Sequence, residues 1–143
     1  MLTLVNARTW QVIASGVQVA STRAERRRGL LHHEYLDPSV ALVLSPCFAV
    51  HTAFMRFAID VVFVDRAGFV VRIMPLLSPW RAAASTKAHA VIEFAGGALR
   101  HRDLCVGDRL YFAPVDVGSD RMLTLTFDFN AETSLQTIAS NSA

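Results

Sequence analysis

The side chains best suited to chemistry concentrate in one stretch, residues 47–65, which reads CFAVHTAFMRFAIDVVFVD. Within it Cys47, His51, Thr52, Arg56 and Asp60 interrupt a run of apolar residues that otherwise suits core strands. An unpaired polar group in a core costs about 1–3 kcal/mol, and an unpaired charge costs far more. These side chains must therefore be paired or lie at an edge of the fold.

Arg56 and Asp60 are four residues apart. In a strand this spacing puts them on one face about 13 Å apart, and a bend near Ala58 would bring them closer. One interpretation is a structural ion pair. The other is a binding cleft, in which Arg56 presents its fork to an anionic group and Asp60 orients it or binds a polar substituent.

Trp80 and Glu93 are further candidates for ligand binding. Trp80 and Arg81 lie in a proline-rich loop, and exposed Trp and Arg are favoured at interfaces, although Trp80 could equally plug one end of a barrel. Glu93 ends an apolar strand just before a Gly-Gly pair that permits close backbone approach. It is either a structural brace or a catalytic acid.

Cys47 and His51, also four apart, could form a thiolate and its base, or half of a metal site. A cysteine nucleophile needs a base within hydrogen-bond reach and a third orienting group, and a zinc site needs three or four ligands. The remaining Cys105, His89 and His101 show no tight ligand spacing. We therefore predict two free thiols, no metal and no cofactor.

Composition predicts one compact domain over residues 1–143. The chain is 52% hydrophobic and 18% charged, with a mean hydropathy of +0.35. Net charge is only +2, and the one tight basic group, residues 23–28, includes Glu25, which argues against nucleic-acid binding. Neither a signal peptide nor an apolar run of membrane length is present, so we expect a soluble, cytoplasmic protein without a membrane partner.

Short β-prone runs punctuated by turn residues dominate the chain. Strands are expected at 2–5, 10–13, 17–20, 41–45, 50–55, 59–65, 69–74, 89–94, 109–113 and 121–130, followed by a frayed tail over 131–143. The first two strands should form a hairpin, and so should the two that flank the DRAG turn at 65–68.

One helix and one or two helical turns complete the predicted elements. Thr22 and Glu25 have capping-box spacing and Gly29 supplies a helix stop, which predicts a helix over 22–29. Residues 98–105 are expected to make the helical turns. The predicted fold class is α+β, mostly β, with a small, partly closed barrel-like sheet.

The order of five segments resembles the family called domain of unknown function 192 (DUF192). They are TRAERRRGL (22–30), the whole 47–65 stretch, PWR (79–81), EFAGG (93–97) and GDRL (107–110), and the resemblance covers roughly residues 2–115. It implies a compact β-rich domain with a barrel-like sheet and a short helix, and no established catalysis. Where many members have Trp-Met-Lys-Asn, this chain has Phe54, Met55, Arg56 and Phe57, which keeps the cation and loses the amide.

Two function hypotheses remain open. The first is a binding or interaction module with a polar cleft around Arg56 and Asp60, which recognises a small anionic or polar ligand or a peptide. The mouth of this cleft is predicted to be formed by His51, Arg56, Asp60 and Trp80. The alternative is a small hydrolase or transferase that uses Cys47 with His51, or Asp60 with Glu93, in acid–base roles. Sequence leaves the choice between them and the oligomeric state open.

Overall fold

The structure is a computed structural model, and it describes residues 2–20, 22 and 35–114. These residues form an all-β fold with the strands β1 (Leu2–Asn6), β2 (Val12–Ala14), β3 (Gly16–Ala20), β4 (Val40–Leu44), β5 (Ala49–His51), β6 (Ile59–Val64), β7 (Val70–Leu77), β8 (Ala82–Ala84), β9 (Ala90–Ala95) and β10 (Leu110–Pro114). The strands form three separate sheets.

A five-stranded sheet of order β3-β4-β9-β6-β7 lies at the centre. Its strands pair antiparallel except β3 and β4, which run parallel. All six residues of β6 are buried, which explains why this strand reads as a continuous apolar run rather than an alternating one. A strand of this kind must be covered on both faces.

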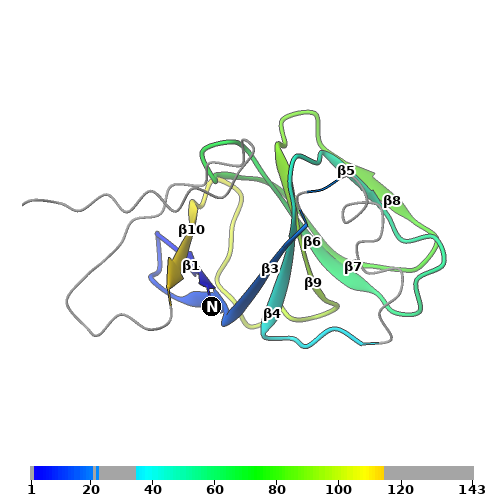
Figure 1. Cartoon of the computed structure of the whole chain (residues 1–143), viewed down its shortest axis with the longest axis horizontal. Helices are drawn as coiled ribbons and strands as arrows, with labels where there is room; N and C mark the ends of the chain where they lie inside the picture. Colours follow the sequence, from blue (N-terminus) through cyan, green and yellow to red (C-terminus); the bar gives the residue numbers. More distant parts are fainter. Residues whose placement is uncertain (1, 21, 23–34, 115–143) are drawn as a thin grey trace, which may run out of the picture.

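The central sheet lies between the sheet β10-β1-β2 and the ribbon β5-β8 (Figure 1), and each of its faces carries its own core. On one face Val62 and Phe94 pack with Leu4 and Leu110 of the sheet β10-β1-β2, and this group is called the first core. On the opposite face Phe63 and its neighbours pack under the two-stranded ribbon β5-β8, whose inward residues are Val50 and Ala83, and this group is called the second core. The described chain is therefore a three-layer arrangement of sheets.

The α+β barrel prediction is wrong for the described residues. They contain no helix, and the three sheets do not close into one barrel. The segment 98–105, expected to make helical turns, forms a run of tight turns, in which the Ala98 and Arg100 N–H groups donate to carbonyl oxygens three residues back. The N–H of Leu99 instead donates to the Asp60 carboxylate, so a tertiary contact takes a donor that a helix would use.

Several strand predictions are confirmed. β1 and β2 form the N-terminal hairpin, and β6 and β7 form the second one around the turn at 65–68, where Gly68 has a positive φ of 87°. The predicted strand 50–55 is wrong beyond His51, because the chain turns there and Phe54 has a φ of 64°. The helix at 22–29, apart from Thr22, and the strand at 121–130 lie outside the described residues.

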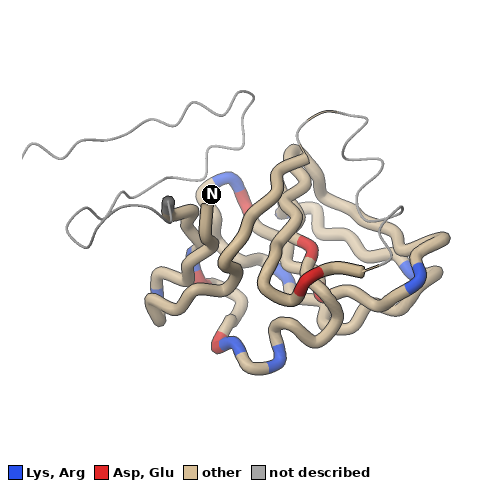
Figure 2. The backbone as a smooth tube through the Cα atoms, turned by 60° about the horizontal axis from the view of Figure 1, so that its bottom comes forward, with Lys and Arg blue, Asp and Glu red and all other residues tan. Residues whose placement is uncertain are grey.

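Charged positions are spread along the described backbone rather than gathered at one end (Figure 2). Residues 2–20, 22 and 35–114 include no helix long and apolar enough to cross a membrane.

Candidate functional site

A buried threonine organises the exposed part of the 47–65 stretch. Thr52 is fully buried, and its Oγ1 accepts the Arg81 N–H at 2.8 Å and lies 2.6 Å from the Ser78 carbonyl oxygen, to which it donates. Its own N–H donates to the Arg81 carbonyl oxygen at 2.8 Å, and its carbonyl oxygen accepts the Trp80 N–H at 3.0 Å. One side chain thus ties the turn after β5 to the loop before β8.

Two aromatic side chains project from the segments that Thr52 ties together. Phe54 is 74% exposed and Trp80 is 60% exposed. Their ring centroids are 4.6 Å apart and the rings are tilted by 59°. Both residues have positive φ angles, 64° and 62°, which for a residue with a side chain costs about 1–3 kcal/mol and persists only where the surroundings enforce it.

Exposed cationic and polar side chains accompany this pair. His51, Arg56 and Arg81 are all exposed, and together with Phe54 and Trp80 they are called the aromatic surface. The segments 45–58 and 78–89, which contain it, carry the cations Arg56, Arg81 and Lys87 and neither Asp nor Glu. These two segments therefore carry a net positive charge.

Asp60 lies elsewhere, on the face of the first core. It is 1% exposed, and its carboxylate accepts three backbone N–H groups, from Leu76 at 2.8 Å, Gly97 at 3.1 Å and Leu99 at 3.0 Å. It lines a pocket that does not include Arg56. The two residues predicted to share a cleft thus lie in different places: Arg56 is exposed on the aromatic surface, and Asp60 is a buried residue that braces the backbone.

Glu93 faces the second core. It lies opposite Val61 in the sheet, whereas Asp60 lies opposite Phe94, so the two carboxylates point to opposite faces and do not form an acid–base pair. Glu93 is 4% exposed, and its Oε2 makes no hydrogen bond with the described residues. Burial raises the pKa of this carboxyl from 4.5 to about 7.

The cysteines and histidines do not assemble a recognisable centre in the described chain. Cys47 and Cys105 are free thiols, and the Cys47 thiol donates to the Ala49 carbonyl oxygen at 3.1 Å. His51 is exposed on β5, His89 is half-buried just before β9, and His101 is exposed in the turn. No group of three or more His, Cys, Asp or Glu residues in the described part could hold a metal ion.

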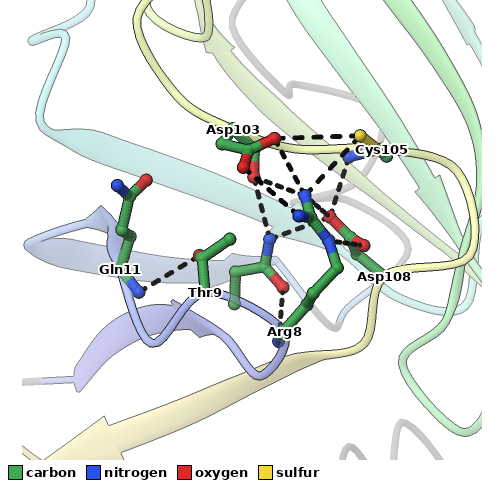
Figure 3. Close-up of polar contacts among 7 residues, drawn as sticks. Arg8, Thr9, Gln11, Asp103, Cys105 and Asp108 are labelled. Carbon is green, nitrogen blue, oxygen red and sulfur yellow. Dashed lines mark hydrogen bonds and ion pairs between the residues drawn. The ribbon is translucent and has the colours of Figure 1, made fainter.

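An ion-pair cluster that sequence reasoning missed connects the β1–β2 turn to the loop before β10 (Figure 3). Arg8 donates from Nε to Asp108 at 2.7 Å and from Nη2 to Asp103 at 2.9 Å. Asp108 also accepts from the Asn6 side chain at 2.9 Å and from the Cys105 N–H at 2.8 Å. The Arg8 hydrogen bond is the main cause that lowers the pKa of Asp108 to about 2.

Two site residues also escaped the sequence reasoning. Phe54 stands out in the sequence only as a departure from the family pattern, and Thr52 only as one of the polar residues that interrupt the apolar run, with no role predicted for it. Their roles depend on the loop at 78–81, more than twenty residues away in the chain, so no local pattern reveals them. The available signal was the family motif itself, which includes Phe54.

Comparison with known proteins places the fold. No curated protein matches the chain. A crystal structure from Sinorhizobium meliloti 1021, described as a "putative transcription regulator", superposes with a TM-score of 0.66 at 17% identity, over 78% of this chain and 91% of that one. A protein of unknown function from Novosphingobium aromaticivorans DSM 12444 superposes with a TM-score of 0.65 at 20% identity, over 76% and 81%.

At these identities the two structures support the fold alone. The family is shown by the sequence profile described as "DUF192: Uncharacterized ACR, COG1430", which matches residues 4–112 and confirms the resemblance seen in the sequence. The chain belongs to the DUF192 family.

Proposed function

We propose that this chain is an interaction module whose aromatic surface binds an acidic segment of a partner peptide. The observation that carries the proposal is the exposed pair Phe54 and Trp80, held in left-handed backbone conformations by the buried Thr52. Strained, exposed and fixed aromatic residues are costly, and such features cluster at binding sites. Trp and Arg are also the residues that contribute most at protein interfaces.

The charge of the surface supports an acidic partner. Arg81 follows Trp80 directly in the chain and Arg56 lies two residues after Phe54, both are exposed, and the segments 45–58 and 78–89 contain no Asp or Glu. Arginine binds a carboxylate through two parallel hydrogen bonds, which gives orientation as well as affinity.

The shape of the ribbon supports an extended peptide. The outward residues of β5 and β8 include Ala49, Ala82 and Ala84, which are exposed and small. Small side chains on this face let a second backbone approach closely, and the aromatic pair lies just beyond the His51 end of the ribbon. A peptide lying along the ribbon would place an apolar side chain on the rings and its carboxylates near the arginines.

The hydrolase or transferase alternative has less support. Asp60 and Glu93 face opposite sides of the sheet, and the Cys47 thiol donates to a backbone carbonyl oxygen. Acid–base catalysis by Asp60 with Glu93 would need both carboxylates on one face of the sheet.

Fluorescence of Trp80 tests the proposal. The chain has two tryptophans, so Trp10→Phe leaves Trp80 as the single reporter. A peptide with capped termini, in which glutamates flank two phenylalanines, should change the emission of Trp80 saturably. Raised salt should weaken the binding of this peptide. Peptides with lysine in place of glutamate, or serine in place of phenylalanine, should bind much less.

Variants in the same background locate the binding. Phe54→Ala and Arg81→Gln should each weaken it by about tenfold, because they remove a ring contact and a carboxylate partner. Arg66→Gln, an exposed arginine in the β6–β7 turn, is the matched control and should leave it unchanged. Equal binding of the lysine peptide, or a stronger response to a single-stranded oligonucleotide, would overturn the proposal.

A further inference from the structure

A second recess lies on the face of the central sheet opposite the aromatic surface. It is an open pocket of about 230 Å³ lined by Asp60, Ile73, Pro75, Leu76, Gly97, Leu99, Arg100 and Leu104. Ile73, Leu99 and Leu104 pack against the first core, whereas the β5-β8 ribbon covers the second. The two sites are therefore separated by the sheet.

The walls of this pocket are fixed by Asp60. Its carboxylate binds the Leu76 N–H on β7 and the Gly97 and Leu99 N–H groups on the turn after β9. Leu76 is held at a φ of 51° by this arrangement while its side chain is 49% exposed. Two segments, β7 and the turn after β9, thus form the recess, and both are hydrogen-bonded to the Asp60 carboxylate.

The charges around the pocket are mixed. A carboxylate offers about four lone-pair positions, and Asp60 uses three of them on backbone donors, so acceptor capacity remains. Arg100 is exposed and lines the same pocket, and the rest of the lining is apolar apart from the Gly97 backbone. A simple anion would meet Asp60 and a simple cation would meet Arg100, whereas a dipolar molecule satisfies both.

Size narrows the ligand further. Pockets for drug-sized molecules measure roughly 300–1,000 Å³, so this recess suits a smaller molecule. We propose that it binds a free aliphatic α-amino acid of about the size of leucine. The ammonium group binds Asp60, the carboxylate binds Arg100, and the side chain packs on Ile73, Leu99 and Leu104.

A ligand series dissects this recognition by NMR. L-Leucine should shift the amide resonances of Leu76, Gly97 and Leu99 saturably, with a Kd of about 1 mM or below. Isopentylamine lacks the carboxylate, 4-methylpentanoate lacks the ammonium group, and glycine lacks the apolar side chain. Each should bind about tenfold or more weakly than leucine.

Two arginine variants complete the test without altering the brace. Arg100→Gln should weaken leucine binding about tenfold and bring it close to that of isopentylamine, while Arg102→Gln, an exposed neighbour, should leave it unchanged. Absence of saturable shifts at about 20 mM leucine, or binding of the three analogues as tight as that of leucine, would overturn the proposal. Leucine should not alter Trp80 emission, so the amino-acid site and the peptide-binding surface are tested independently.

Discussion

Asp60 and Glu93 lie on neighbouring strands of one sheet and are both almost fully buried, yet their carboxylates have opposite hydrogen-bonding environments. Asp60 accepts three backbone N–H groups on the face of the first core. Glu93 faces the second core with an Oε2 that makes no hydrogen bond to the described residues, and burial raises its pKa to about 7. Burial alone therefore does not decide what a buried carboxylate does.

Available donors make the difference. Asp60 lies near the end of the sheet, where the β7 irregularity and the Gly96-Gly97 turn present backbone N–H groups that no strand uses. Glu93 lies between Leu42 and Val61 in the middle of the sheet, where the neighbouring backbone groups are occupied by strand pairing. Backbone donors satisfy the carboxylate in the first setting, and burial disfavours the charged form in the second.

The largest effect is expected from removing the satisfied carboxylate. Asp60→Ala leaves three backbone donors without their acceptor and should lower the free energy of unfolding by about 3–5 kcal/mol. Chemical denaturation measures this loss. Asp65→Ala is the matched control, because its Oδ1 also accepts two backbone N–H groups but in an exposed turn, and it should cost only about 1 kcal/mol. Similar losses for the two variants would contradict the role of Asp60 as a buried brace.

Glu93 should produce a pH dependence of the opposite kind. Its pKa is raised in the folded state, so the folded state binds more protons than the unfolded state between pH 4.5 and about 7. Stability should therefore fall as pH rises through this window, by an amount on the order of 3 kcal/mol. Glu93→Gln should be more stable than the native chain at pH 8 and similar to it at pH 4.

Thermal or urea denaturation across this pH range gives the comparison. The two proteins differ only at position 93, so the difference in stability between them isolates the contribution of Glu93. A difference that stays constant from pH 4 to pH 8 would show that Glu93 is not a desolvated carboxyl.

A third carboxylate, Asp108, should give a smaller pH dependence of stability than Glu93, and one of opposite sign. Its pKa is lowered to about 2, chiefly by the Arg8 hydrogen bond, so the stability it contributes is present above its ordinary value near 4 and is lost as pH falls toward 2. Arg8→Gln should flatten this acid loss. The effect is modest because the Arg8 side chain is 45% exposed, so solvent screens its ion pair with Asp108. An unchanged profile between pH 4 and pH 2 would contradict the assignment.

Several strands and the turns between them could be predicted from the sequence alone. The hairpin around 65–68 follows from a Gly-containing turn between two apolar runs, and the continuous apolar stretch of β6 indicates a strand covered on both faces. The family resemblance was equally accessible, because its motifs occur in order along the chain. Each of these patterns spans only a few residues, so each can be recognised without knowledge of the fold.

The assembly of the sites was decided by tertiary structure. The sequence predicted a cleft joining Arg56 with Asp60 and a possible pairing of Asp60 with Glu93, and neither spacing reveals that a turn follows His51 or that the two carboxylates face opposite sides. Phe54 meets Trp80 only because Thr52 bonds to the loop at 78–81, and Arg8 meets Asp108 across 100 residues. Side-chain partners of this kind depend on sheet order and register, which are set by long-range pairing and leave no local pattern in the chain.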